Sequence, residues 1–321
     1  MKNKNIQYRV GGLLYSPAIN LSLADKIANK AFPNLTAMAF CLEDSIQDEA
    51  LEQAEATLKE TLFALMEKHI DVENLPLLFV RIRTPEHMRK VHMMLRESES
   101  IIAGYILPKF DMSNAQEYKE IVLSINSCAE KPIYIMPILE SKPIADVYTR
   151  HNTLLNLKMI LDSMKEYVLN VRVGGNDFSN LYGVRRSCEQ TIYDIGVIRD
   201  ILVDILSVFS KEYVVSGPVW EYFGSDANDA WAQGLSKELK LDRANGFIGK
   251  TAIHPSQLPI IFDSLKVRRA DYDDARRILE WKSTQYAVEK SSDGTRMNEV
   301  KCHGKWAEKI VILGEIYGIK E

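Results

Sequence analysis

The chain has 321 residues, of which 46% are hydrophobic and 26% are charged, and its formal net charge is −4. This composition predicts a folded, soluble protein large enough for one barrel-sized domain and an extension. It shows no basic block typical of nucleic-acid binding and no apolar run near the ~20 residues of a membrane helix.

The N-terminus and the cysteines predict a cytoplasmic protein. The first ten residues lack the apolar core of a signal peptide. Cysteines stand at 41, 128, 188 and 302, with no C-x-x-C pair that would indicate a zinc site or a redox motif. We therefore expect free thiols in a reducing compartment.

Eight apolar runs rich in strand-forming residues alternate with helical patterns along most of the chain. Several runs are continuously apolar, as expected for parallel strands covered on both faces. The predicted strands are 12–15, 36–42, 77–82, 103–107, 133–139, 168–173, 213–216 and 246–253.

Helical patterns lie between the predicted strands. Residues 47–68 carry one apolar stripe and follow Ser45, which with Asp48 resembles a capping box. Thr84 before Pro85 and Ser113 before the next helical pattern fit N-cap chemistry. Residues 191–209 form another amphipathic pattern, and Pro255 after His254 suits a first helical position.

This alternation predicts an α/β fold, a (β/α)₈ TIM barrel, with its active site at the C-terminal ends of the strands. A doubly wound open sheet is the alternative, but residues 16–19 after the first strand are not the Gly-rich phosphate loop that it normally carries. We predict a catalytic barrel over residues 1–265 and a C-terminal helical extension or lid over residues 266–321. Within the extension we expect a helix at 269–290, a polar loop at 291–304 and a helix at 305–317.

Two acidic residues follow successive predicted strands. Glu140 follows the run ending at Leu139, and Asp177 follows the run ending at Val173 and two glycines. Mg²⁺ prefers a few carboxylate oxygens and leaves other positions to water and substrate. The spacing therefore indicates a metal-assisted enzyme, with Glu140 and Asp177 as candidate Mg²⁺ ligands.

Further polar residues follow other strands and would meet at the same mouth. Arg81 suits a substrate carboxylate or enolate but also an ion pair with Glu43. Glu43 and Asp44 are adjacent, so their side chains should point to opposite faces of the strand. One would face the mouth and the other would face the helix layer. Alternatively, Asp44 could cap the following helix. Lys109 could form a Schiff base in a metal-free aldolase or act as a counter-charge. His254 could serve acid–base chemistry or cap the following turn.

These residues, in this order, resemble the citrate lyase β-subunit and malyl-CoA lyase branch of the HpcH/HpaI aldolase superfamily. The likeness spans about residues 13–258, and its longest phrase is G-F-I-G-K-T-A-I-H-P-S-Q at 246–257. The shorter matching phrases are L-L-Y-S-P at 13–17, C-L-E-D-S-I at 41–46, F-V-R-I-R at 79–83, I-L-P-K at 106–109, I-L-E-S at 138–141 and G-G-N-D-F at 174–178.

The resemblance implies roles for individual residues. Glu140 and Asp177 would be the Mg²⁺ ligands, Arg81 would bind a substrate carboxylate or oxyanion, and Glu43 with Asp44 would support the arginine and metal-bound water. Substrate contacts would further involve the residues that share these phrases, namely Pro108, Lys109, Gly175, Asn176 and His254.

The phrase D-G-T-R-M-N-E at 293–299 resembles the family's C-terminal lid, one residue longer. Glu299 stands where related lyases carry an aspartate proposed for acid–base work. In this family the C-terminal segment often reaches a neighbouring subunit, so the resemblance implies a homo-oligomer.

The predicted function is a Mg²⁺-dependent carbon–carbon lyase that performs reversible aldol- or Claisen-type cleavage through a metal-stabilised enolate. Its partner would be a small carboxylate or 2-oxo acid, or a CoA thioester, with no nucleic acid and no membrane. Thioester hydrolysis or phosphoenolpyruvate-type chemistry at the same site is one alternative. A non-catalytic barrel that acts as a subunit or ligand sensor is the other.

Overall fold

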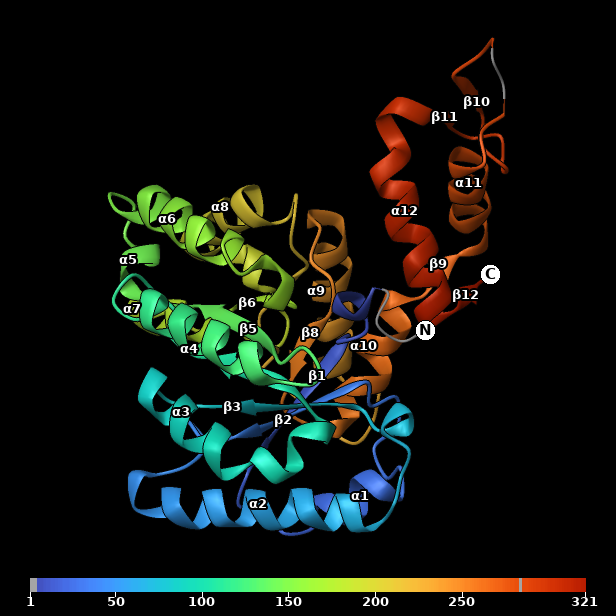
Figure 1. Cartoon of the computed structure of the whole chain (residues 1–321). Coiled ribbons are helices and arrows are strands. Elements are labelled where there is room, and N and C mark those ends of the chain that lie inside the picture. The colour runs from blue at the N-terminus through green and yellow to red at the C-terminus, as the bar shows by residue number, and fades with distance from the viewer. Residues whose placement is uncertain (1–4, 283–284) are drawn as a thin grey trace.

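The computed structural model describes residues 5–282 and 285–321 and contains an eight-stranded parallel barrel (Figure 1). Neighbouring strands pair in sequential order from β1 to β7, β8 pairs with β1, and a parallel bridge between Gly217 and Lys250 joins the remaining two ends. The predicted TIM barrel is therefore confirmed, and the open doubly wound sheet is excluded. The strands are β1 (Gly12–Pro17), β2 (Ala37–Cys41), β3 (Leu77–Arg81), β4 (Ile102–Leu107), β5 (Tyr134–Leu139), β6 (Val171–Val173), β7 (Val215–Ser216) and β8 (Lys250–Ala252).

Side chains of each strand point alternately into the barrel and toward the helices. A smaller apolar cluster that includes Leu13, Ala39 and Phe79 fills the interior, whereas a larger one that includes Phe40 and Val80 joins the strands to the helix layer. Both faces of the strands are thus covered, which explains the continuously apolar runs.

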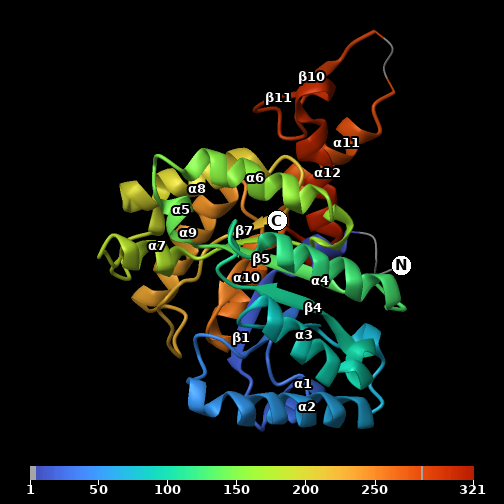
Figure 2. The same ribbon diagram turned by 60° about the vertical axis from the view of Figure 1, so that its left-hand side comes forward.

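Helices surround the barrel (Figure 2). The observed start of α3 agrees with the predicted N-cap at Thr84. The Thr84 side chain accepts a hydrogen bond from the backbone N–H of His87, and Pro85 lies in the first turn. The helices that follow β1 to β8 are α1 (Leu23–Ala28), α2 (Leu51–Glu67), α3 (Pro85–Met94), α4 (Ala115–Cys128), α5 (Lys142–Ala145), α6 (Arg150–Asp162), α7 (Gly175–Leu181), α8 (Gly196–Phe209), α9 (Ala230–Asn245) and α10 (Leu258–Leu265).

Two predicted caps are wrong. The turn before α2 begins at Asp48 with Gln47 at its N-cap position, so Ser45 is not the cap; Asp48 instead forms an ion pair with Arg83. The N-cap position of α4 belongs to Asn114, because Ser113 hydrogen-bonds Asp111 in the preceding turn. In both places a local side-chain contact competes with capping.

Short 3₁₀ turns complete the connections. Thr191 and Asp194 form a capping box around the turn before α8, so the predicted helix 191–209 is a 3₁₀ turn followed by an α-helix. His254 caps the turn that Pro255 begins. The turns are η1 (Ile6–Tyr8), η2 (Asp48–Ala50), η3 (Val72–Asn74), η4 (Arg96–Ile101), η5 (Lys165–Tyr167), η6 (Ile192–Asp194) and η7 (Pro255–Gln257).

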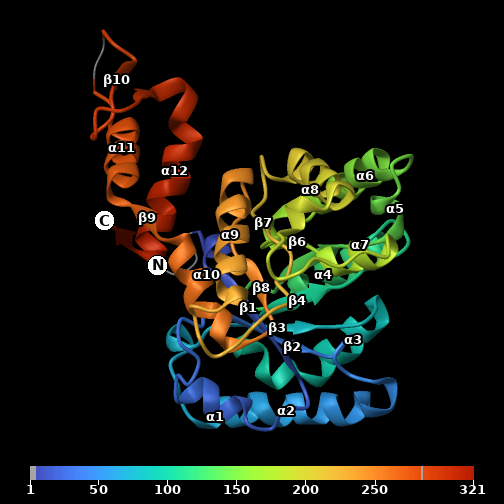
Figure 3. The same cartoon turned by 180° about the vertical axis from the view of Figure 1, so that it is seen from behind.

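The C-terminal region is a helical hairpin of α11 (Arg269–Leu279) and α12 (Val300–Tyr317), which projects from the barrel (Figure 3). The strands β9 (Val267–Arg268) and β12 (Ile319–Lys320) pair in parallel at its base. The division into a barrel and an extension at residue 265 stays a prediction.

Two details of the predicted extension are wrong. The helix predicted for 269–290 ends at Leu279, and the loop predicted for 291–304 contains part of an antiparallel pair, β10 (Val288–Lys290) with β11 (Met297–Glu299). Residues 283 and 284 of that predicted helix lie outside the described residues. A turn at Asp293-Gly294 joins the two strands of this pair; Gly294 has φ 73°, and Asp293 accepts hydrogen bonds from Ser291 and Thr295. An Asp-Gly pair is a strong hairpin signal.

None of the helices in residues 5–282 and 285–321 is long and apolar enough to cross a membrane.

Candidate active site

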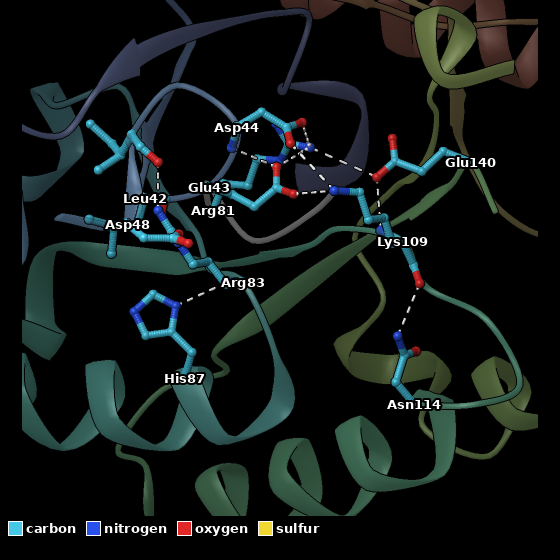
Figure 4. Close-up of polar contacts among 11 residues, drawn as sticks. Leu42, Glu43, Asp44, Asp48, Arg81, Arg83, His87, Lys109, Asn114 and Glu140 are labelled. Atoms are coloured by element: carbon cyan, nitrogen blue, oxygen red, sulfur yellow. Dashed lines mark hydrogen bonds and ion pairs between the residues drawn. The ribbon is translucent and has the colours of Figure 1, made fainter. Parts of the chain in front are cut away.

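Charged side chains from four consecutive strand exits meet at the C-terminal mouth of the barrel (Figure 4). Glu43 and Asp44 follow β2, Arg81 ends β3, Lys109 follows β4 and Glu140 follows β5. The parallel strands carry these positions to one rim, as the sequence predicted.

Arg81 is the centre of this network. Its buried guanidinium contacts three carboxylates through Nη2: Glu43 Oε2 at 2.7 Å, Asp44 Oδ2 at 3.0 Å and Glu140 Oε1 at 3.8 Å. Burial lowers the pKa of Arg81, but Tyr15, Glu43 and Glu140 together raise it further above its ordinary value. Arg81 is therefore permanently charged and held in one orientation.

Lys109 connects the two sides of the network. Its Nζ lies 2.7 Å from Glu43 Oε1, and its backbone N–H donates to Glu140 Oε1 at 2.8 Å. The backbone of Lys109 has φ 47°, a left-handed conformation that is uncommon outside glycine. The hydrogen bond to Glu43 raises the pKa of Lys109. A Schiff-base lysine needs a lowered pKa, so this environment argues against the metal-free mechanism.

Glu140 and Asp177 line one cavity of about 300 Å³, together with Lys109 and Asn180. The pKa of Glu140 is raised to about 8, mainly by burial and secondly by the negative charge of Asp177. Two carboxylates thus stand close together where little water screens their repulsion. A bound divalent cation would relieve that repulsion.

Gly174 makes room for this pair. A Cβ atom built at Gly174 would overlap Oε2 and Cβ of Glu140, so no larger residue fits there without displacing the carboxylate. Gly175 is similarly close to Pro218. The two glycines before Asp177 therefore allow the exit of β6 to approach that of β5.

The donor set fits Mg²⁺. In the described part of the chain, no group of three or more His, Cys, Asp or Glu side chains could hold a metal ion. Mg²⁺, however, is usually bound by one or two carboxylates and completes its octahedron with water and substrate oxygens. Glu140 and Asp177 would hold it, and the cavity beside them offers space for the remaining ligands.

Other predicted site residues have different surroundings. Pro108 is buried beside Lys109, and Asn176 is exposed in the first turn of α7. His254 Nδ1 contacts the Ser256 hydroxyl at 2.8 Å, and its ring stacks on Phe223. Within the described residues, His254 therefore has a capping role and forms no ion pair with the Arg81 network; its part in substrate binding stays a prediction.

Glu299 does not join the site within one chain. It ends β11, its backbone N–H donates to His303 Nδ1, and its carboxylate accepts from the Cys302 thiol. The hairpin that carries Glu299 lies on the opposite side of the barrel from α5 and α7 (Figures 1 and 3). Helix α5 follows Glu140, and helix α7 contains Asp177.

Two residues near the mouth were missed by sequence reasoning. Arg81 lies over the Tyr15 ring at 5.6 Å, and Arg172, a fully buried arginine of β6, interacts electrostatically with Tyr15. Arg172 Nη2 also donates to Thr251 Oγ1 at 2.7 Å. The available signal was a single arginine inside an otherwise apolar strand, since such charges are rarely buried without a specific role.

The chain matches the model of a known protein family. Residues 4–319 match the model of a family described as C–C bond lyase of the TIM-barrel fold. Comparison with curated protein sequences finds no match.

Solved structures share the fold at low sequence identity. A citrate lyase from Burkholderia xenovorans is 16% identical with a TM-score of 0.71, covering 97% of this chain and 92% of the other. The protein CitE of Mycobacterium tuberculosis, in complex with magnesium, acetoacetate and coenzyme A, is 18% identical with a TM-score of 0.60, covering 96% and 99%. RipC of Yersinia pestis is 17% identical with a TM-score of 0.53, covering 80% and 95%.

Proposed function

The chain belongs to the C–C bond lyase family of the TIM-barrel fold, and from this premise we propose that it cleaves or forms a carbon–carbon bond in a small carboxylate or 2-oxo acid with the help of Mg²⁺. The observation that carries the proposal is the pairing of Glu140 and Asp177 at one cavity beside Arg81. Two structures from Mycobacterium tuberculosis support this choice of ligands: the citrate lyase β subunit in complex with oxaloacetate and magnesium, and the protein CitE in complex with magnesium and pyruvate.

Each residue of the network has a part in the proposed reaction. Glu140 and Asp177 hold the cation, which when bound supplies Lewis-acid polarisation of a substrate carbonyl and is typically worth several kcal/mol. The backbone N–H of Lys109 fixes the Glu140 carboxylate. Pro108, next to Lys109 in the chain, and Gly175 and Asn176, which precede Asp177, are proposed substrate contacts.

Arg81 binds the substrate carboxylate or the oxygen on which negative charge develops. Its ion pairs with Glu43, Asp44 and Glu140 are made through Nη2. Nη1 is the proposed donor to the substrate oxygen. Glu43 and Asp44 hold the guanidinium in place. Such a preorganised donor typically contributes about 3 kcal/mol to transition-state stabilisation.

Proton transfer is assigned to Glu299 of a second copy of the chain. Glu299 lies away from its own barrel mouth, in a projecting hairpin of suitable form to cover a neighbour. The proposal therefore includes a homo-oligomer whose sites are completed across subunits. We also propose that this oligomer is located in the cytoplasm.

The test combines binding and product analysis. The purified chain is incubated with MgCl₂ and a panel of 2-oxo acids and acyl-CoA thioesters, and products are identified by mass spectrometry. We expect Mg²⁺-dependent carbon–carbon cleavage or condensation, reduced about 100-fold or more by Asp177→Asn and unchanged by Asp200→Asn, an exposed acid of α8.

Three outcomes would overturn the proposal. Hydrolysis of a thioester without a new or broken carbon–carbon bond would indicate the alternative chemistry. Binding of Mg²⁺ and a 2-oxo acid without turnover would indicate a sensor. Normal Mg²⁺-dependent turnover by the Asp177→Asn variant would show that the carboxylate pair is not the metal site.

A further inference from the structure

A second cavity, of about 720 Å³, lies at the opposite end of the barrel from Arg81. It is bordered by the residues that precede or begin strands β2 to β5, including Thr36, Leu77 and Tyr134. Leu77 and Arg81 are the two ends of β3, so about 13 Å of strand separates this cavity from the candidate active site. The volume is within the range of small-molecule sites, which is about 300–1,000 Å³.

The cavity combines apolar walls with positive charge. Phe32, Leu35 and Leu75 contribute apolar surface, and Arg9, Lys26, Lys30 and Lys131 contribute cationic side chains. Glu73 is the single acidic residue among the residues that line it. The chain as a whole has a net charge of −4, so this concentration of cations is a local feature.

Three of the cations have no carboxylate partner. Within residues 5–282 and 285–321, Arg9, Lys26 and Lys30 form no ion pair, and Nε of Arg9 is buried without a hydrogen-bond acceptor. Lys131 Nζ instead donates to two backbone carbonyls, those of Ser100 and Ile102, at 2.8 and 2.7 Å. Lys26 and Lys30 are exposed and Arg9 is half-buried, so the positive groups lie at an open cavity. Cations gathered at such a cavity without carboxylate partners favour an anionic ligand.

The loop that carries Lys30 is held in an unusual conformation. Lys30 has φ 53° and Asn34 has φ 58°, and both residues line the cavity. At Lys30 this conformation ends α1, because the backbone N–H of Ala31 donates to the carbonyl of Lys26 at 2.9 Å, an arrangement common at helix C-termini. It brings the apolar Phe32 and Leu35 and the cationic Lys30 to the same opening.

From these observations we propose that this cavity is a second ligand site, which binds a small amphiphilic anion: an apolar chain or ring system against Phe32, Leu35 and Leu75, and a carboxylate or similar anionic head group near Arg9, Lys26 and Lys30. The site uses none of the residues of the candidate active site. The proposal of a second ligand site is therefore independent of the proposed lyase reaction.

The test is isothermal titration calorimetry on the full chain with three probes. Octanoate has both an apolar chain and a negative head, octyl glucoside has the same chain with a neutral head, and acetate has the head without the chain. We expect octanoate to bind at least about tenfold more tightly than either of the others.

Substitutions locate the binding site. Lys26→Gln with Lys30→Asn removes two charges, and asparagine tolerates the left-handed backbone at position 30. We expect this double variant to weaken octanoate binding about tenfold or more. The matched control, Lys211→Asn with Lys305→Gln, removes two exposed charges elsewhere and should leave binding unchanged. Leu75→Trp fills the apolar side and should abolish binding without lowering the melting temperature.

Asp177→Asn separates this proposal from the proposed function, because octanoate binding should be retained even if that variant loses all turnover. The proposal is overturned if octanoate binding is undetectable, if octyl glucoside binds equally well, or if the Lys26/Lys30 variant binds octanoate like the unmodified chain. A further outcome would also overturn the proposal: the Lys26/Lys30 variant keeps octanoate binding but changes its elution volume in size-exclusion chromatography. The cavity would then be a contact between copies of the chain.

Discussion

Arg81 and Glu43 form a buried ion pair, with Nη2 of the arginine 2.7 Å from Oε2 of the glutamate. Glu43 also accepts a hydrogen bond from Lys109 Nζ, so one carboxylate connects the exits of β3 and β4. A buried ion pair stabilises a fold only when both partners are present, because removal of one leaves an uncompensated charge.

The first prediction concerns this pair. Glu43→Gln should lower the free energy of unfolding by about 1–3 kcal/mol, because Arg81 loses its closest partner but keeps Asp44. The double variant with Arg81→Met should lose less than the sum of the two single variants, as measured by urea denaturation. Asp44→Asn, at a half-exposed position, should cost under about 1 kcal/mol. Additive losses would contradict a coupled pair.

The second prediction concerns the glycine beside Glu140. Gly174→Ala places a methyl group where the Glu140 carboxylate lies, so we expect Mg²⁺ affinity and turnover to fall about tenfold or more while the fold is kept. Gly196→Ala is the matched control, because a Cβ at Gly196 meets no atom within 4 Å. Mg²⁺ binding is measured by calorimetry. Equal affinity of the two variants would contradict a metal site at Glu140.

The third prediction follows from the pKa of Glu140, which burial and Asp177 raise to about 8 in the folded chain, against an ordinary value of 4.5. Between these two values the folded state holds a proton that the unfolded state has released. Glu140 therefore adds stability that is fully present below pH 4.5 and is lost as pH rises through about 8. With EDTA present, the unmodified chain should gain stability relative to Glu140→Gln as pH falls from 8.5 to 5.5. A constant difference between their unfolding free energies would refute the raised pKa.

The barrel could be predicted from sequence because strand burial on both faces leaves a direct signal. Every predicted strand overlaps an observed one, although β6, β7 and β8 are shorter than their apolar runs. The runs extend beyond the strands because residues such as Tyr213 and Phe247 are buried outside the hydrogen-bonded ladder. Burial, rather than strand pairing, determines the apolar pattern.

The meeting of Glu43, Arg81, Lys109 and Glu140 was also predictable, because parallel strands bring their ends to one rim. Their contacts were not. The left-handed backbone at Lys109 directs its N–H to Glu140, and nothing in the local phrase I-L-P-K indicates that conformation. The C-terminal hairpin is formed by packing between α11 and α12, and its position depends on contacts of α12 with α10 and η1, which periodicity does not specify.

The last prediction tests whether sites are shared between subunits. If Glu299 acts at the barrel mouth of a neighbouring copy, Asp177→Asn and Glu299→Gln would damage different parts of the same composite site. Each variant alone should be nearly inactive. Mixing them with subunit exchange should restore a fraction of the activity, because some sites would combine an intact Asp177 from one copy with an intact Glu299 from another. Mixing Asp177→Asn with Glu140→Gln is the control: both substitutions lie in the same barrel, so every hybrid site would remain defective. Turnover is assayed before and after exchange. Full activity of Glu299→Gln alone, or equal recovery in both mixtures, would show that Glu299 takes no part in proton transfer across subunits.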